Sequence, residues 1–145
     1  MKAAALLLVA AIAAAGCGGG DDSNDFRKGY NAVVRQYSSL PGEVGTAVRG
    51  ASAKTDKQLE AQFTDLADRL SDELAKLRKL HPPGRAKDEY KAFIDDLAKV
   101  EDDLDAIARS AKAHSAKQAS NASKALVKDS TSVDKDEDAL KKAVD

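Results

Sequence analysis

The chain has 145 residues, enough for one domain, and its 23 basic and 24 acidic side chains leave a net charge of −1. This balance argues against a nucleic-acid-binding protein, because such proteins usually carry a basic surplus. A single Cys excludes a disulfide within the chain, and one Cys with two His cannot supply the four ligands of a Cys/His zinc site.

The first sixteen residues have the pattern of an export signal. Lys2 supplies a positive charge, and the thirteen residues from Ala3 to Ala15 carry no polar side chain. This length is typical of the apolar region of a signal peptide and is too short for a membrane span, which needs about 20 residues. We therefore expect residues 1–16 to be a signal peptide.

The residues that follow resemble a bacterial lipobox, because Ala14, Ala15 and Gly16 are small and precede Cys17. The resemblance implies that the Cys17 thiol receives a diacylglyceryl group and that the signal is cleaved between Gly16 and Cys17. Residues 17–24 would then be the lipidated Cys and a flexible tether, with the protein held on the outer face of the bacterial cytoplasmic membrane.

An ordinary export signal is the open alternative. The commonest lipobox has Leu where this chain has Ala14, and Ala13, Ala14 and Ala15 also fit an A-x-A site cleaved after Ala15. Cleavage there would give a secreted soluble protein with a free Cys17.

Residues 25–145 have the apolar periodicity of helices and are expected to form one helical bundle domain. The first helix is predicted to begin near Asp25, with Ser23 or Asn24 as its cap. Pro41 removes a backbone donor, which predicts a kink or short break with the same face still turned inward. The predicted inward positions are Phe26, Tyr30, Val33, Tyr37, Leu40, Val44, Val48 and Ala51.

The second helix is predicted to start at Thr55, which forms a capping box with Gln58, and to end at Pro82-Pro83-Gly84. Its apolar stripe comprises Leu59, Phe63, Leu66, Leu70, Leu74, Leu77 and Leu80. The third helix has a coiled-coil seam with alternating steps of four and three. The seam comprises Ala86, Tyr90, Phe93, Leu97, Val100, Leu104, Ile107 and Ala111, and a turn is predicted at Ala113-His114.

The fourth helix has a second candidate capping box, Ser115 with Gln118. Asp129, Ser130, Thr131 and Ser132 are poor helix formers, so we expect the helix to fray or bend there. The positions that keep the helical phase are Ala119, Ala122, Leu126, Val133, Leu140 and Val144.

Four helices with short connections predict an all-α fold, an up-down-up-down antiparallel four-helix bundle. The alternative is an elongated helical hairpin that completes its core against a second copy of the chain.

Motifs for cofactor chemistry are missing from the sequence, so we expect no cofactor, no metal site and no enzymatic activity. Neither His81 nor His114 follows a Glu at the spacing of a di-iron site, and c-type haem attachment needs a second Cys. We interpret both His as residues at helix ends or turns. The acidic runs at residues 101–105 and 134–138 are interpreted as solvated helix faces, and the aromatic residues of the stripes as core.

The layout resembles small Ala-rich helical lipoproteins of high-GC Gram-positive bacteria. The residues that carry the resemblance are the lipobox, the Gly/Asp tether, and the connection from Leu77 to Pro83 followed by Tyr90 and Phe93. The resemblance implies a surface location and a helical domain, without indicating an activity.

These features together predict a non-enzymatic, membrane-anchored lipoprotein of the cell envelope whose helical bundle binds an envelope partner. A carrier of a small apolar ligand or lipid between the helices is the alternative. A third hypothesis is self-association of bundles along their seams. The sequence leaves the oligomeric state open.

Overall fold

The computed structural model describes residues 21–144, and these residues form an all-helical, antiparallel four-helix bundle, as the sequence predicts. The first arm of the bundle is broken into α1 (Asp21–Gln36) and α2 (Leu40–Gly50). The other three are α3 (Asp56–Leu77), α4 (Lys87–Lys112) and α5 (Ala116–Val144). Short 3-10 helices, η1 (Ala51–Ala53) and η2 (Gly84–Ala86), lie in the connections.

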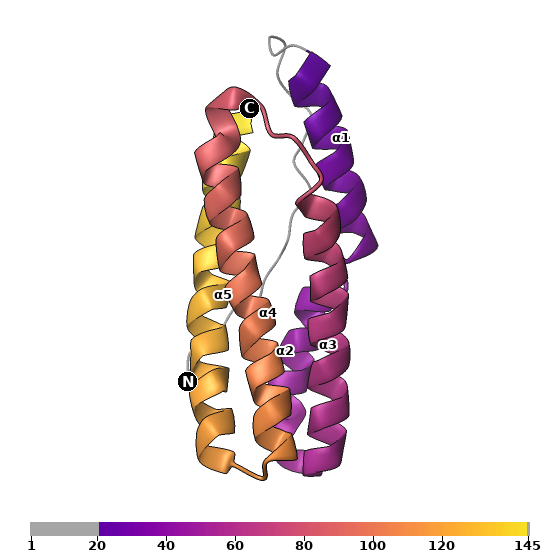
Figure 1. The fold of residues 1–145 in the computed structure, drawn as a ribbon, viewed down its shortest axis with the longest axis vertical. Coiled ribbons are helices and arrows are strands. Elements are labelled where there is room, and N and C mark those ends of the chain that lie inside the picture. Colours follow the sequence, from indigo (N-terminus) through magenta and orange to yellow (C-terminus); the bar gives the residue numbers. More distant parts are fainter. Residues whose placement is uncertain (1–20, 145) are drawn as a thin grey trace.

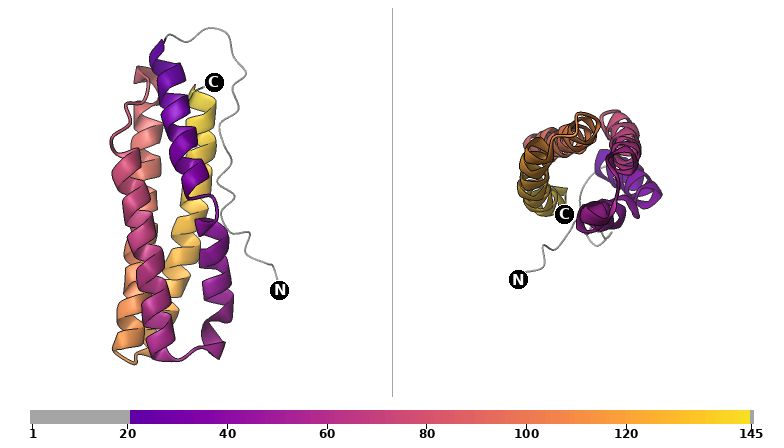
Figure 2. Two further views of the ribbon diagram at one scale, coloured as in Figure 1. Left: turned by 90° about the vertical axis from the view of Figure 1, so that its right-hand side faces the viewer. Right: turned by 90° about the horizontal axis from the view of Figure 1, so that it is seen from below.

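The helices run nearly parallel to the long axis of the molecule, and α4 packs most extensively against α5 and α3 (Figures 1 and 2). The α1–α2 arm completes the ring of helices seen along the axis in Figure 2. One end of the bundle holds the start of α1, the connection between α3 and α4, and the end of α5 (Figure 1). The opposite end holds η1, the start of α3 and the turn between α4 and α5.

The first arm differs from the prediction at its start. Helix α1 begins at Asp21 rather than near Asp25, so residues 21–24 of the expected tether are helical and Ser23 and Asn24 lie inside the helix. Ser23 is buried there, and this packing outweighs the weak helix preference of such residues. The predicted break is confirmed at residues 37–39, with Pro41 in the first turn of α2, where a missing N–H is tolerated.

The buried face of this arm is partly the predicted one. Val34 and Ala47 are buried, whereas Val33, Val48 and Ala51 are only half-buried. A straight helix repeats every 3.6 residues, so a strict alternation of four and three drifts off the buried face over several turns. The predicted positions that the structure confirms as buried are Phe26, Tyr30, Tyr37, Leu40 and Val44.

Helix α3 has the predicted capping box. The Gln58 N–H donates to Thr55 Oγ1 at 3.3 Å, and the Thr55 N–H donates to Gln58 Oε1 at 3.0 Å. The helix ends at Leu77 rather than continuing to Pro82, and the Tyr90 hydroxyl donates to the Leu77 carbonyl at 2.7 Å. A side chain of α4 therefore satisfies a carbonyl that a longer helix would have used. His81 lies four residues beyond the helix end, so its predicted place at that end is wrong.

All eight predicted seam positions of the third helix are buried, from Ala86 in η2 to Ala111 near the end of α4. The predicted turn is also confirmed, and His114 there has a left-handed φ of 52°. The His114 N–H donates to the Ala111 carbonyl at 3.0 Å, and the Ser115 N–H donates to the Ser110 carbonyl at 2.9 Å. These two bonds form a Schellman motif, in which Gly usually takes the left-handed position.

We expect the substitution His114→Gly to stabilise the protein by about 0.5–1 kcal/mol, because Gly adopts a positive φ without steric cost. The contact that would be lost, His114 Nδ1 to Asp56 Oδ2 at 2.5 Å, joins two exposed side chains and contributes little. The measurement is the urea midpoint of unfolding. His114→Ala is the matched control, because it removes the same contact and keeps the strain. An equal gain with Ala would contradict the backbone explanation.

The predicted fraying of the last helix is wrong, since α5 is continuous from Ala116 to Val144. Ser130 lies on its buried face between Leu126 and Val133, which are also buried. The Thr131 hydroxyl donates to the Val127 carbonyl at 2.9 Å, so this polar side chain is satisfied within the helix. Packing against α4 thus outweighs the weak helix preference of residues 129–132.

Candidate functional site

The predicted lipidation site at Cys17 and the predicted cleavage site between Gly16 and Cys17 lie outside the described residues. Within residues 21–144, the feature with the most distinctive chemistry is a polar group in the core. Tyr30 of α1, Glu73 of α3 and Glu137 of α5 have exposed fractions of 0%, 6% and 3%. We call these three residues the interior cluster. Two carboxyl groups at such depth are unusual, because burying a charge is costly.

Glu137 is the partnered carboxylate of the interior cluster. The Tyr30 hydroxyl donates to Glu137 Oε1 at 3.2 Å, and Lys141 Nζ lies 3.3 Å from Glu137 Oε2. Burial raises the pKa of Glu137, while Lys141 and the Tyr30 hydrogen bond act in the opposite direction. Burial and the neighbouring Glu137 raise the pKa of Tyr30, so the phenol stays protonated and keeps its role as donor. This contact joins α1 to α5 across the core.

Glu73 has a different environment. Within the described part of the chain its carboxyl group makes no hydrogen bond or ion pair, and burial, followed by the charge of Glu137, raises its pKa to about 7. It lines a cavity of about 20 Å³ together with Leu70, Phe93 and Leu97. Such a volume is enough for about one water molecule. Glu73 therefore changes its charge near neutral pH inside an apolar core.

The interior cluster can exchange protons, but its surroundings give no room for a substrate. Tyr30 packs against Phe93 with ring centroids 6.0 Å apart, and the rings of Phe26 and Tyr90 are perpendicular with centroids 5.1 Å apart. Among residues 21–144, no group of three or more His, Cys, Asp or Glu is arranged to hold a metal ion. The direct consequence of this chemistry is a stability that depends on pH.

The sequence interpretation missed both carboxylates. Glu137 belongs to the run at residues 134–138 that was interpreted as a solvated face, and this interpretation is wrong at Glu137. The signal was present in the spacing, because Glu73 lies three residues after Leu70 and four before Leu77. Likewise, Glu137 lies four residues after Val133 and three before Leu140. The register of a polar residue with an apolar stripe indicates that it lies on the inward face of its helix.

The second acidic run, at residues 101–105, also differs in part from its predicted solvation. Burial raises the pKa of Asp103 to about 6, and Asp129 of α5 adds to the shift through its charge and a hydrogen bond. The α4–α5 interface therefore carries a second group that titrates in the acidic range.

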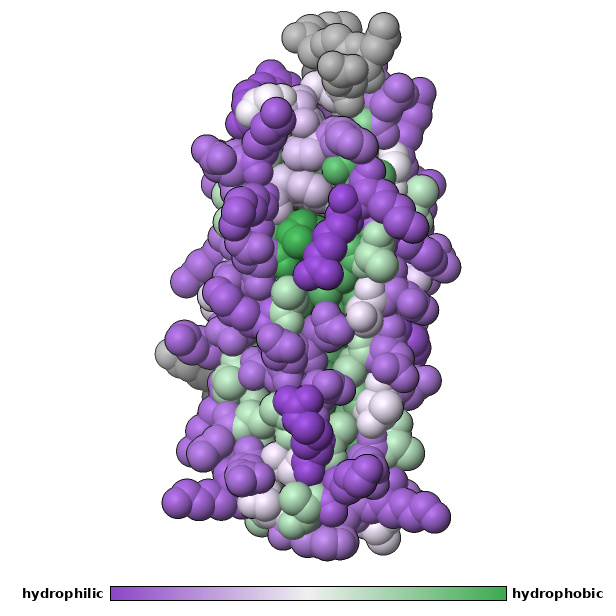
Figure 3. Space-filling view, viewed as in Figure 1, coloured by the Kyte–Doolittle hydropathy of each residue, from purple (hydrophilic) through white to green (hydrophobic). Residues whose placement is uncertain are grey.

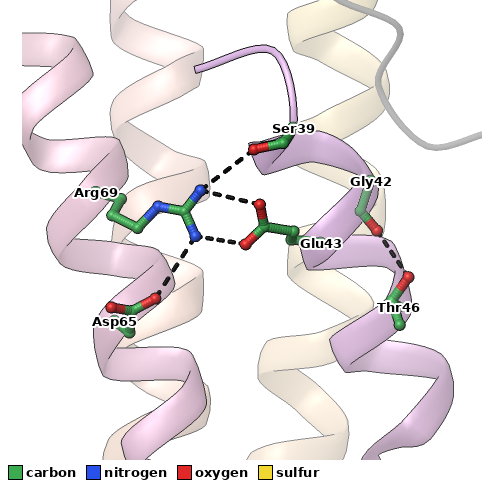
Figure 4. Close-up of polar contacts among 6 residues, drawn as sticks. All are labelled: Ser39, Gly42, Glu43, Thr46, Asp65 and Arg69. Carbon is green, nitrogen blue, oxygen red and sulfur yellow. Dashed lines mark hydrogen bonds and ion pairs between the residues drawn. The ribbon is translucent and has the colours of Figure 1, made fainter. Parts of the chain in front are cut away.

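A surface ion pair holds the broken first arm against α3 (Figure 4). Arg69 Nη2 donates to Glu43 Oε1 at 3.0 Å, a second bond joins Arg69 Nη1 to Glu43 Oε2, and Asp65 Oδ2 lies 3.6 Å away. Hydrogen bonds from Arg69, and then from Ser39, lower the pKa of Glu43 to about 2. The bidentate geometry fixes the start of α2 beside α3, directly after the break.

The fold and the interior cluster define an all-helical antiparallel bundle with a titratable core. Comparisons with protein-family models, with curated proteins and with solved structures found no match to this chain. None of the helices between residues 21 and 144 has the length and apolar character that crossing a membrane requires.

Proposed function

We propose that this protein is a non-enzymatic lipoprotein of the bacterial cell envelope, anchored through Cys17, whose helical bundle binds an envelope partner. The observation that carries the proposal is the order of features in the chain. A predicted export signal is followed by a Cys in a lipobox-like context, and helix α1 begins only four residues after that Cys. This order fits a folded domain displayed at a membrane surface.

The packing of the bundle favours partner binding over the carrier alternative. The cavity beside Glu73 has a volume of about 20 Å³, whereas sites for small organic ligands are typically ~300 Å³ or more. An apolar ligand or lipid would have to separate the helices to enter there. A carrier that holds its ligand at this point of the core therefore requires an opened form of the bundle.

The surface indicates what kind of contact such a partner would make. The face shown in Figure 3 is mostly hydrophilic, and hydrophobic residues show mainly along the middle of the bundle, between helices. Val127, with an exposed fraction of 43%, is the only large exposed hydrophobic residue in the described part of the chain. Charged and polar groups would thus form most of the contact, which suits a reversible complex.

The test of the anchor is an intact mass measurement on protein extracted from bacterial membranes. We expect the mass of residues 17–145 plus a diacylglyceryl group, with or without a third acyl chain. Cys17→Ser should lose the acyl mass and the membrane association, because no thiol remains to accept the lipid. Ala14→Leu, which restores the commonest lipobox residue, is the control and should stay lipidated.

Unlipidated protein of residues 16–145 in the medium would contradict the anchor and support the secreted alternative. Purification of the lipidated protein with a bound apolar molecule, whose removal lowers the stability of the bundle, would favour the carrier function instead.

A further inference from the structure

The end of the bundle that lies next to the predicted anchor is fixed by chain geometry. Cys17 and Asp21 are separated by four peptide units, which span at most about 14 Å when fully extended. Helix α4 has 26 residues and is therefore about 39 Å long. The end of the bundle where α1 begins must therefore stay close to a membrane that holds Cys17.

The connection between α3 and α4 lies at that same end. The first turns of α1 and this connection enclose a hollow of about 530 Å³, lined by Asp25 and Phe26 on one side and by residues 79–84 and Lys87 on the other. Arg27 of α1 and Arg85 of η2 both donate to the carbonyl of Val144, at the end of α5. The start of α1, the connection and the end of α5 thus form one surface (Figure 1).

The connection from residue 78 to residue 87 carries a local excess of positive charge, whereas the exposed Asp25 in α1 and Asp88 in α4 carry the opposite charge at the same end of the bundle. Residues 78–87 contain no acidic residue, and Arg78, Lys79, His81, Arg85 and Lys87 are all exposed. Lys79, His81 and Lys87 line the hollow, where Asp25 is the one carboxylate among the described lining residues. Clusters of basic residues beside a membrane anchor bind anionic lipid headgroups.

We propose that residues 78–87 dock on the membrane surface, where Arg78, Lys79 and Lys87 meet the phosphates of anionic lipid headgroups, so that the bundle stands with its α4–α5 turn away from the membrane. This inference rests on the proposed function, because it needs the anchor at Cys17. It adds an orientation: the turn at His114 and the connection at η1 become the surface that is presented to the envelope partner.

Two glycines provide a matched pair of positions for the test. Gly84 lies in the connection and Gly50 at the opposite end of the bundle, and a Cβ built at either position has no heavy atom within 4 Å. Cys17 is the only native Cys, and its thiol is blocked by the lipid, so Gly84→Cys or Gly50→Cys supplies a unique labelling site. Each lipidated variant is labelled with a fluorophore and reconstituted in vesicles of phosphatidylglycerol and phosphatidylcholine that carry a headgroup nitroxide quencher.

We expect strong quenching at position 84 and little at position 50, since quenching by contact does not reach across the length of the bundle. Replacing Arg78, Lys79 and Lys87 by Gln should lower the ratio of docked to undocked molecules. About fivefold is expected for each charge, on the order of a hundredfold for all three. Replacing Lys54, Lys57 and Lys117 by Gln is the control, because these exposed residues lie near the opposite end.

Equal quenching at the two positions, or none at either, would overturn the orientation even with a lipidated protein. A quenching ratio that the first triple substitution leaves unchanged would overturn the role of the basic residues. Absence of the acyl mass on Cys17 would overturn the anchor and this inference together, so the two failures are distinguishable.

Discussion

The folded protein should lose stability as the pH rises from about 4.5 to about 7, and Glu73 should be the main cause. Its pKa is raised from 4.5 to about 7 in the folded state, so the folded chain binds this proton more tightly than the unfolded chain. The contribution of Glu73 to the stability is therefore greatest below pH 4.5. It falls as the pH rises and levels off above the folded-state pKa. At 1.36 kcal/mol per pKa unit, the loss is about 3 kcal/mol.

Urea unfolding at pH 5 and pH 8 measures this loss directly. We expect Glu73→Gln to remove most of the difference in unfolding free energy between pH 5 and pH 8, because the amide side chain stays neutral at both pH values. Asp72→Asn is the matched control, since Asp72 is the preceding residue of α3 and is exposed. Asp72→Asn changes the net charge of the protein by the same amount as Glu73→Gln at pH 8, but it should preserve the pH dependence of the stability. If Glu73→Gln were as pH-dependent as the unchanged protein, the buried carboxyl group would not be the cause.

Glu137 and Asp103 act in the same direction, because the pKa of each is also raised in the folded state. A residual pH dependence in Glu73→Gln is therefore expected and should be smaller. Tyr30 distinguishes the two glutamates, since its hydroxyl donates to Glu137 and makes no such bond to Glu73. The packing of α1, α3 and α5 against one another thus depends on the protonation state of the interior cluster.

The sequence predicts the fold where the apolar pattern alone decides the structure. Helix α4 is the clearest case, because every residue of its seam is buried and the adjoining turn falls at Ala113-His114. The capping box of Thr55 is equally local, since it needs only two side chains three residues apart. Residues that are close in the chain determine these features, so the sequence alone is enough to predict them.

The errors arise where a tertiary contact outweighs a local preference. Residues 129–132 favour a break by themselves, and packing on α4 keeps α5 continuous through them. Helix α3 stops at Leu77 although its apolar pattern continues to Leu80, and the Tyr90 hydroxyl of α4 donates to the Leu77 carbonyl at this end. The interior cluster belongs to the same class. Acidic residues are usually solvated, and only the register of Glu73 and Glu137 with the apolar stripes indicates burial.

Leu74→Ala should be strongly destabilising, by about 3 kcal/mol, although the sequence gives no reason to rank it above the other leucines of its stripe. Leu74 has an exposed fraction of 0% and lies in the middle of the core, next to Glu73. Truncation removes buried apolar surface and leaves a cavity that the surrounding helices fill only in part. Since domains of this size are stable by roughly 5–15 kcal/mol, the loss is a large fraction of the total.

Leu59 of the same helix provides the control, because it belongs to the same predicted stripe but is only half-buried, near the start of α3. Leu59→Ala removes the same atoms, and we expect it to cost about 1 kcal/mol or less, since water can occupy the space that is vacated. Chemical unfolding at pH 5, where Glu73 is mostly protonated, keeps the packing term separate from the electrostatic one. Equal losses for the two variants would mean that the core is not centred on Leu74, and the burial of Glu73 beside it would then lose its structural basis.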